Sequence, residues 1–265
     1  MNRIFFCIVL GLLMSCKQTV NTGFQDNPVV ESYLYADESP TVRISKLIPF
    51  TSDMVLSDMD VNKLSVDITD VTSGKKYALT STGNGAYSNS ALTISVGKTY
   101  QLSFPYNGQV VTATTVAPGK PQNMTLSASN ISIAQRGSTV NGGMPEMPDP
   151  IEMNWTNDDG SFYFVYVKNV ESVKVPIDTR NPNGKDFFRN QPISSNSYEL
   201  NPRSFQFYGQ HRIILYKIEP EYVLFFQENS SSSLSISEIK ANVVNGLGIF
   251  TAVSSVSAYL YVGKP

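Results

Sequence analysis

Hydrophobic and polar residues alternate over short segments along most of this chain, most clearly at 64–71 and 99–104. Alternation with a period of two is typical of a β-strand that has one buried and one exposed face. Gly, Asn and Pro residues separate these segments at intervals of ~8 to 12 residues, as turns do in β-sandwiches. Long runs with helical apolar spacing are absent. The pattern therefore predicts an all-β protein.

The first half of the pattern predicts an N-terminal β-sandwich over residues 28–118. Its expected strands lie at 29–35, 41–47, 64–71, 76–80, 91–96, 99–104 and 109–116. A Pro/Gly cluster at 118–121 follows the last of these segments, and a new series of strands begins after it. Such clusters are typical of domain boundaries.

The second half predicts a C-terminal sandwich over residues 119–265. Strands are expected to begin near 124–126 and to continue at 151–156, 162–167, 204–208, 212–218, 222–227, 243–253 and 257–262. The polar segment 178–191 is predicted to be a long loop, and 234–239 fits either a strand or a short helical turn. Two β-sandwich domains of the immunoglobulin/fibronectin III class are therefore expected.

Trp155, the single tryptophan, lies in an alternating segment before a turn of Asx and Gly residues. This arrangement resembles the B and C strands of a fibronectin type III sandwich. Because Ile151, Met153 and Trp155 share one face of the expected strand, we predict that the indole is part of the core.

The first residues have the pattern of a signal peptide at 1–15. Arg3 supplies positive charge, 4–13 is apolar and too short to cross a bilayer as a helix, and Ser15 precedes Cys16. This order resembles the lipobox of bacterial lipoproteins, in which the cysteine is acylated after cleavage. Residues 16–27 are then a lipidated tether. The alternative is an ordinary secretory signal with an incidental cysteine.

The lipobox interpretation also predicts where the protein resides. Cys7 would leave with the signal peptide and Cys16 would carry lipid, so no disulfide is expected in the mature protein. Two or more acyl chains anchor a protein stably to a membrane. Lys17 follows the cysteine where an aspartate would favour retention at the inner membrane, so we expect attachment to the outer membrane. Its periplasmic and surface faces both remain open.

Composition argues against partners that are recruited by charge. The 265 residues are 41% hydrophobic and 16% charged, with a formal net charge of -2. This balance does not favour binding to nucleic acid.

Candidates for catalytic and metal chemistry are sparse. His211 is the only histidine, no G-x-S-x-G motif occurs, and we expect no enzyme activity and no cofactor. Asp53, Asp58 and Asp60 supply oxygen ligands of the kind that calcium uses, but their spacing differs from an EF-hand loop. A solvated acidic connection is the preferred interpretation. The acidic residues at 158–160 are likewise interpreted as part of a turn and not as a metal site.

Aromatic residues crowd two segments, 162–166 and 222–226, and would occupy both faces of a strand. Such rings either pack in the core or form a surface for a partner or a glycan. Core packing is the preferred use.

The lipobox at Cys16, the opening segment at 28–34 and the closing segment at 242–250 together resemble the Bacteroidetes lipoprotein family DUF4249. Gly246 and Gly248 in the closing segment suit a turn or bulge before a final strand. The family has no established activity, so no catalytic residue is carried over. The resemblance implies an accessory lipoprotein of the outer membrane that acts with a TonB-dependent, SusC-like transporter. The alternative is a carbohydrate-binding lipoprotein similar to SusE. A glycan or a peptide is the expected ligand.

Overall fold

The structure is a computed structural model that describes residues 27–46, 60–137, 146–231 and 241–265. These residues form three β-sheets and one α-helix, so the prediction of an all-β fold is confirmed. The signal peptide, Cys16, Asp53 and Asp58 lie outside the described residues, as does the ambiguous segment 234–239. Among the described helices, none is long and apolar enough to span a membrane.

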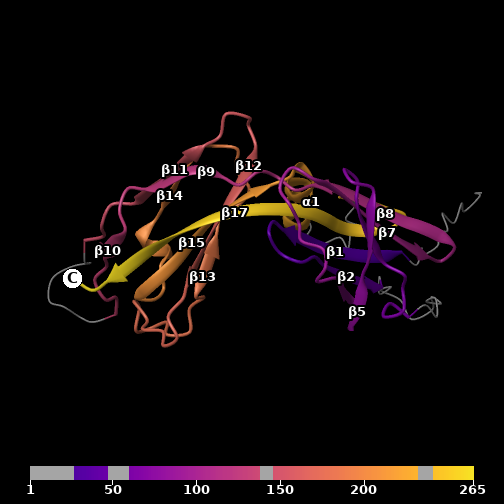
Figure 1. Ribbon diagram of the computed structural model, residues 1–265. Helices are drawn as coiled ribbons and strands as arrows, with labels where there is room; N and C mark the ends of the chain where they lie inside the picture. The colour runs from indigo at the N-terminus through magenta and orange to yellow at the C-terminus, as the bar shows by residue number, and fades with distance from the viewer. Residues whose placement is uncertain (1–26, 47–59, 138–145, 232–240) are drawn as a thin grey trace, which may run out of the picture.

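The largest sheet contains nine strands of the described chain, and eight of them follow the order β13-β12-β15-β17-β1-β2-β6-β5. The ninth, β10, pairs with β17. Figure 1 shows β17 running along the middle of the molecule. The bounds are β1 Pro28–Tyr35, β2 Thr41–Lys46, β5 Thr80–Gly83, β6 Ala86–Ser88, β10 Asn130–Ser132, β12 Phe162–Asn169, β13 Phe187–Arg189, β15 Gly209–Ile218 and β17 Leu247–Gly263.

Two smaller sheets cover one face of the large sheet at different places along β17. One has the order β16-β8-β7-β3-β4, and the other has the order β14-β11-β9. Their bounds are β3 Asp67–Asp70, β4 Lys75–Ala78, β7 Thr99–Tyr106, β8 Gln109–Val116, β9 Gln122–Leu126, β11 Ile151–Thr156, β14 Ser197–Leu200 and β16 Val243–Val244.

Each smaller sheet encloses a separate hydrophobic core against the large sheet. Phe250 and Ala252 of β17 belong to the core that lies against the five-stranded sheet. Leu260 and Val262 of the same strand belong to the core against the three-stranded sheet. Because side chains alternate along a strand, these four even-numbered residues point to one face. The molecule is therefore two sandwiches that share a continuous sheet, and the boundary proposed at 118–121 stays a prediction.

The close pairing of β1 with β17 depends on a glycine in the closing segment. The two strands run parallel, with Val30 opposite Gly248. Gly248 has a φ of +92°, and a Cβ atom there would collide with the backbone carbonyl oxygen of Val30. Asn245 also has a positive φ, of 59°, in the turn before the strand. The glycine therefore serves both a special backbone conformation and a close approach of two strands.

Segment 91–96 is not a strand, so that prediction was wrong. Leu92 and Ile94 are buried as an alternating strand would bury them. However, the backbone N–H of Ile94 donates to the carbonyl of Glu38, and its own carbonyl accepts from the N–H of Asp37. The segment therefore satisfies its backbone against the β1–β2 turn without joining a sheet ladder.

Segment 222–227 was predicted to be a strand, but it lies in helix α1, Pro220–Ser231. Proline suits the first turn of a helix, and Glu221 is an acidic residue in that turn. Tyr222, Phe225 and Phe226 follow the i, i+3, i+4 spacing of a helix face, and all three pack in one apolar cluster. The aromatic run therefore has a helical period that its β-like composition concealed.

Two further sequence predictions were wrong in detail. The loop predicted at 178–191 contains strand β13, which pairs with β12 at the edge of the large sheet. The strand predicted at 204–208 is absent, because a 3-10 turn, η2 Pro202–Ser204, occupies its start. The side chain of Asn201 caps that turn by accepting a hydrogen bond from the N–H of Arg203.

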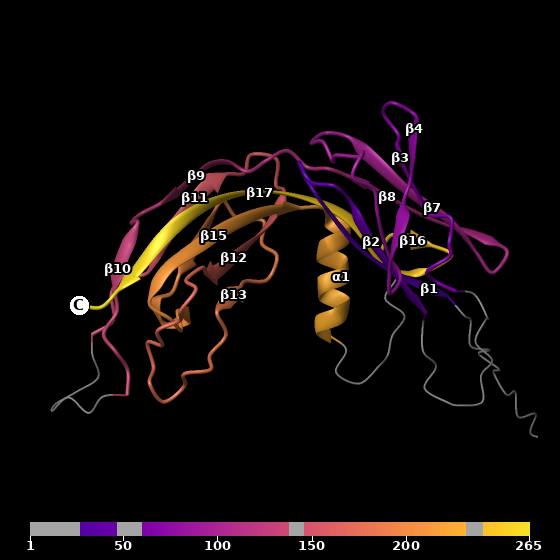
Figure 2. The same ribbon diagram turned by 60° about the horizontal axis from the view of Figure 1, so that its bottom comes forward.

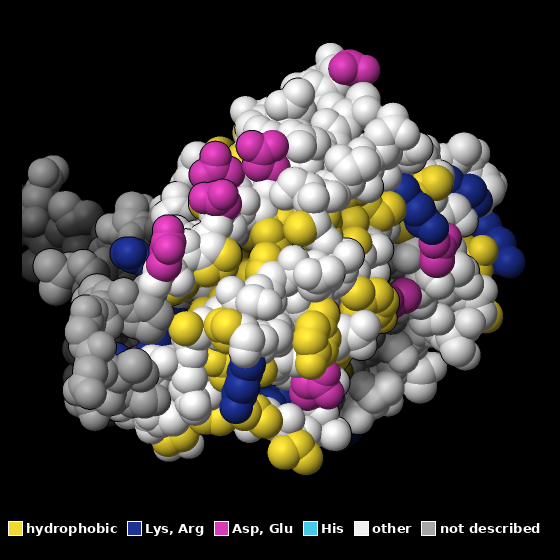
Figure 3. All heavy atoms as spheres, turned by 90° about the vertical axis from the view of Figure 1, so that its left-hand side faces the viewer, with side chains coloured by type: hydrophobic (Ala, Val, Ile, Leu, Met, Phe, Trp, Pro, Cys, Tyr) yellow, Lys and Arg dark blue, Asp and Glu magenta, His cyan; other side chains and the backbone are white. Residues whose placement is uncertain are grey.

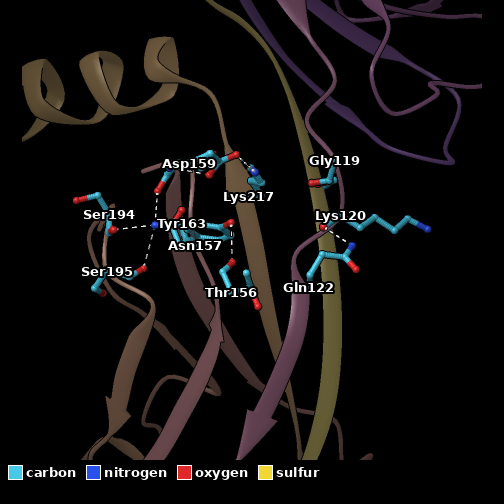
Figure 4. A network of polar contacts seen from close by, with 12 residues as sticks. Gly119, Lys120, Gln122, Thr156, Asn157, Asp159, Tyr163, Ser194, Ser195 and Lys217 are labelled. Atoms are coloured by element: carbon cyan, nitrogen blue, oxygen red, sulfur yellow. Dashed lines mark hydrogen bonds and ion pairs between the residues drawn. The ribbon is translucent and has the colours of Figure 1, made fainter.

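Trp155 is in the core, as predicted. In β11 the residues Ile151, Met153 and Trp155 are buried, whereas Glu152 and Asn154 are exposed. Polar contacts hold the turn that follows (Figure 4), where the side-chain amide of Asn157 donates to backbone carbonyls of Ser161 and Ser194.

Candidate functional site: an aromatic groove

A cluster of aromatic side chains lies on the face of the large sheet opposite the two cores. Figure 2 shows this face as the inner side of an arch, with β12 and β13 on one side, β1 and β2 on the other, and α1 projecting below it. Ile249 and Val253, two odd-numbered residues of β17, belong to this cluster. The alternation of the strands therefore assigns one face to the cores and the other to this cluster.

The face is hollowed by two neighbouring cavities. The larger has a volume of about 620 Å³, and the smaller has a volume of about 370 Å³. Tyr35, Tyr216 and Val253 line both cavities, so the two adjoin each other. We call the larger cavity the aromatic groove. Its aromatic lining consists of Tyr33, Tyr35, Phe164, Tyr166, Tyr216 and Tyr222.

The rings contact each other in a continuous series. Tyr216 stacks on Phe164 with centroids 4.7 Å apart, and Phe164 stacks on Tyr222 at 5.4 Å. The ring of Tyr33 meets Tyr222 edge to face at 6.1 Å, and Tyr35 meets Tyr216 at 6.3 Å. These are the separations of favourable aromatic pairs, each worth about 0.5–1.5 kcal/mol beyond burial. The groove is therefore preformed by contacts among its own rings.

Strand register explains why residues distant in sequence meet here. Phe164 of β12 lies opposite Tyr216 of β15, and Tyr216 lies opposite Ser255 of β17. Because Ser255 is small, it leaves room above β17 for the rings of Tyr35 and Tyr216 to approach each other. Helix α1 adds Tyr222 from outside the sheet.

Burial keeps the phenol groups of the groove neutral. It raises the pKa of Tyr33 and of Tyr216 to about 12, with neighbouring acidic groups adding to the effect. The pKa values of Tyr35, Tyr166 and Tyr222 are raised as well, chiefly by burial. Neutral phenols both donate and accept hydrogen bonds. The groove therefore offers flat apolar surfaces with neutral polar tips.

Three charged side chains also line the aromatic groove, namely Glu31, Lys168 and Arg189. The guanidinium group of Arg189 donates to the hydroxyl of Tyr222 over 3.5 Å and lies 5.8 Å from the ring centroid of Phe226. Beyond the groove, Tyr166 stacks on Phe187 of β13 at 5.5 Å. The groove thus has charged groups as well as aromatic rings in its lining.

The side chain of His211 is buried and is held by contacts within the protein. It is 3% exposed, its Nδ1 lies 3.1 Å from the carbonyl of Gly209, and its Nε2 lies 3.4 Å from the side-chain amide of Asn169. Burial lowers the pKa of the imidazole to about 4. These contacts fit a neutral ring with its proton on Nδ1. The histidine therefore lies in the second core, away from the groove.

Asp60 and Asp159, two of the acidic candidates in the described part of the chain, are each held by their own partners. The carboxylate of Asp60 accepts hydrogen bonds from the backbone and side chain of Asn62, as in a turn. Asp159 pairs with Lys217 at 2.9 Å (Figure 4), and this contact holds the pKa of its carboxyl far below the usual value. Over the residues that the structure describes, no three His, Cys, Asp or Glu side chains gather as metal ligands.

Sequence reasoning identified only part of the groove. The segments 162–166 and 222–226 contain Phe164, Tyr166 and Tyr222, and the latter segment contributes from a helix. Tyr33, Tyr35, Tyr216 and Arg189 were not singled out. The two residues Tyr33 and Tyr35, spaced by two in a strand, are the signal that could have indicated an aromatic face.

Other exposed aromatic groups continue toward the end of β17. Tyr259 and Tyr261 are each more than half exposed. Figure 3 views the molecule from the end where β10 lies and shows hydrophobic side chains in separate patches, with acidic side chains gathered toward the upper left. The exposed surface of this half is therefore divided into apolar and charged regions.

Comparison of the sequence with models of known protein families identifies the family of this chain. The model of the family described as "Domain of unknown function (DUF4249)" matches residues 18–258. No curated protein matches the chain in sequence. Among solved structures, the two fibronectin type III domain segment from chicken tenascin is similar with 12% sequence identity and a TM-score of 0.25, covering 89% of this chain and 99% of that one. The family match spans most of the sequence, and the chain belongs to the DUF4249 family.

Proposed function

We propose that this protein is a non-catalytic binding protein of the cell envelope, anchored by lipid at Cys16, and that the aromatic groove holds a carbohydrate. The observation that carries the proposal is the gathering of six aromatic rings around one cavity. Its volume of about 620 Å³ falls in the range of about 300–1,000 Å³ that is usual for small-molecule sites.

The chemistry of the groove suits a sugar better than a wholly apolar ligand. A pyranose ring has a face of C–H groups, which packs on an aromatic ring, and a rim of hydroxyl groups, which need hydrogen-bond partners. Tyrosine supplies both kinds of surface in one side chain. Five of the six rings are tyrosines, and their phenols stay neutral at physiological pH.

A binding role is favoured over catalysis by the lining of the groove. Its carboxylate is Glu31, and the described lining brings no histidine, serine or cysteine beside it. Acyl transfer and hydrolysis need a nucleophile or activated water with a base within hydrogen-bond reach. The residues that line the groove are suited to bind a ligand through stacking and hydrogen bonds.

Delivery to a TonB-dependent, SusC-like transporter of the outer membrane is the wider role that we propose. It is supported by the lipobox and by the sequence resemblance to lipoproteins that accompany such transporters. A carbohydrate bound in the groove would then be the cargo. Co-purification with a transporter from detergent extracts tests this part, and a tagged protein recovered without one from native membranes would count against it.

The groove is tested by calorimetric titration of the purified protein with a panel of neutral and acidic oligosaccharides. We expect Tyr216→Ala to weaken binding by about tenfold, because loss of one aromatic contact costs about 1 kcal/mol or more. Tyr77→Ala is the matched control, because Tyr77 is a half-buried tyrosine of β4 in the five-stranded sheet. Equal effects of the two variants, or no binding across the panel, would contradict the proposed site.

A further inference from the structure

We propose, resting on the function above, that the ligand is an acidic oligosaccharide whose carboxylate or sulfate groups meet a basic cluster at one end of the groove. The cluster consists of Lys168 on β12, Arg189 on β13 and Arg212 on β15. Lys168 and Arg189 line the larger cavity, and Arg212 lines the smaller cavity that adjoins it.

Strand pairing brings these cations together on one face. Lys168 lies directly opposite Arg212, in the register in which Phe164 lies opposite Tyr216. Arg189 lies opposite Tyr166, one step away along the same face. Residues that are opposite each other, or two apart in one strand, share a face of the sheet. The three cations therefore continue the face that carries the aromatic rings.

Like charges directly opposite each other destabilise a sheet unless another charge compensates them. None of the ion pairs among the described residues involves the basic cluster. Arg212 donates to the hydroxyl of Ser257 at 3.2 Å, and Arg189 donates to the hydroxyl of Tyr222. These partners are neutral. In the part of the chain that is described, no ion pair therefore neutralises the charge of the cluster.

The acidic residues of the two cavities are Glu31, which lines the larger one, and Asp37 and Glu38, which line the smaller one together with Arg212. Glu31 is on β1, opposite Ile249, and Asp37 and Glu38 follow β1 in its turn. Asp37 already pairs with Lys120 at 2.5 Å. Asp186, which precedes β13, pairs with Lys174 at 3.2 Å. Glu31 thus lies far along β17 from Arg212, which is opposite Tyr259, and Asp37 and Asp186 are paired with other cations, so an anionic group is favoured beside the basic cluster.

Aromatic rings flank the basic cluster in a way that suits a sugar acid. Phe187 lies opposite Lys168, and Tyr259 lies opposite Arg212. Both rings are at least 40% exposed. A uronate ring packed on such a side chain would place its carboxylate beside the cations, where a guanidinium group forms paired, charge-assisted hydrogen bonds. Because the net charge of the protein is -2, this attraction comes from the local cluster and not from bulk charge.

The test compares two hexasaccharides of different charge, oligogalacturonate and neutral maltohexaose, by calorimetric titration at low and high salt. We expect oligogalacturonate to bind about tenfold more tightly at low salt, with the advantage reduced at high salt because exposed charges are screened. Lys168→Gln and Arg212→Gln should each weaken its binding by about tenfold, the effect of one charge-assisted hydrogen bond. Their melting temperatures serve as a check on folding.

Lys75→Gln is the matched control, because Lys75 is an exposed lysine of β4 in the five-stranded sheet. It should leave the binding of oligogalacturonate unchanged, and an equal loss in this variant would show non-specific attraction and overturn the inference. If both sugars bind equally and depend on Tyr216, the inference fails while the proposed function stands. If neither they nor any other oligosaccharide of the panel binds, the proposed function fails as well.

Discussion

Trp155 and Tyr163 pack against each other across the turn that joins β11 to β12, with ring centroids 5.4 Å apart and an angle of 51° between the ring planes. One ring comes from the three-stranded sheet and the other from the large sheet, so the pair joins the two layers of the second sandwich. Both residues are at most 4% exposed. The indole Nε1 is buried and has no hydrogen-bond partner among the described residues.

We predict that Trp155→Ala destabilises the protein by about 3–5 kcal/mol, because truncation of a buried aromatic ring leaves a large cavity. Trp155→Phe keeps a ring against Tyr163 and removes the buried N–H group, so it should cost clearly less. Urea unfolding followed by circular dichroism measures both changes. A Trp155→Ala variant as stable as the wild type would show that the ring is not a core element.

Gly248→Ala is predicted to destabilise the shared sheet. The substitution adds a Cβ atom at a φ of +92° and against the carbonyl oxygen of Val30, so it strains the backbone and separates β1 from β17. A strained backbone conformation costs about 1–3 kcal/mol before any clash is counted. Gly119→Ala is the control, because no atom lies within 4 Å of its added Cβ. Thermal melts compare the two, and equal melting temperatures would argue against the close approach.

The shifted pKa values of His211 and Glu219 predict opposite pH dependences of stability. His211 has a native pKa of about 4 against an ordinary 6.5, so the unfolded chain binds a proton that the native chain does not. Stability is then lost as the pH falls from 6.5 to 4, by about 3 kcal/mol. Burial, with Glu221 adding to the effect, raises the pKa of Glu219 from 4.5 to about 7, so its contribution is lost as the pH rises through this interval.

The variants His211→Gln and Glu219→Gln should separate these contributions. His211→Gln removes the loss on acidification, so its stability relative to the wild type improves from pH 7 to pH 4.5. Glu219→Gln removes the opposing contribution, so its relative stability declines over the same interval. Free energies of unfolding in urea at the two pH values measure both. Parallel pH profiles for the wild type and both variants would contradict the two shifts.

Cys16→Ala is predicted to move the protein from the membrane fraction to the soluble fraction. The reason is the basic, apolar and small-residue order of the first residues, which resembles a lipobox. Cys7→Ala should leave attachment unchanged, because that cysteine lies in the segment that is removed. Fractionation and immunoblotting, with processing checked by mass, measure the result. A processed Cys16→Ala protein that stays in the membrane fraction would refute lipid attachment at this residue.

The sequence predicts secondary structure most reliably where the residue pattern within one segment is sufficient to determine it. Alternation in 151–156 predicted both β11 and the burial of Trp155, and 109–116 corresponds to β8. Prediction from the sequence fails where contacts with another segment of the chain determine the structure. Ile94 has the burial of a strand residue, but its backbone bonds to the turn after β1. Aromatic residues at 222–226 favour a strand by composition, while Pro220 and packing against Phe164 produce a helix.

The groove could be predicted only in part for a similar reason. Aromatic residues in β12 are visible in the sequence, but their meeting with Tyr35 depends on β17 lying between β15 and β1. Likewise, nothing local indicates that Lys168 faces Arg212, since this follows from the antiparallel register of β12 and β15. The candidate site is therefore a product of topology, which alternation alone does not specify.

The central position of β17 has a consequence for the order of folding. Its first half pairs with β1, which lies far away along the sequence, and its second half pairs with β15. Closing such distant contacts costs chain entropy before any stability is gained, and it slows folding. A translating ribosome completes β1 long before β17 emerges, so neither half reaches its final pairing during most of synthesis. The shared sheet, and with it both hydrophobic cores, is therefore completed only late in synthesis.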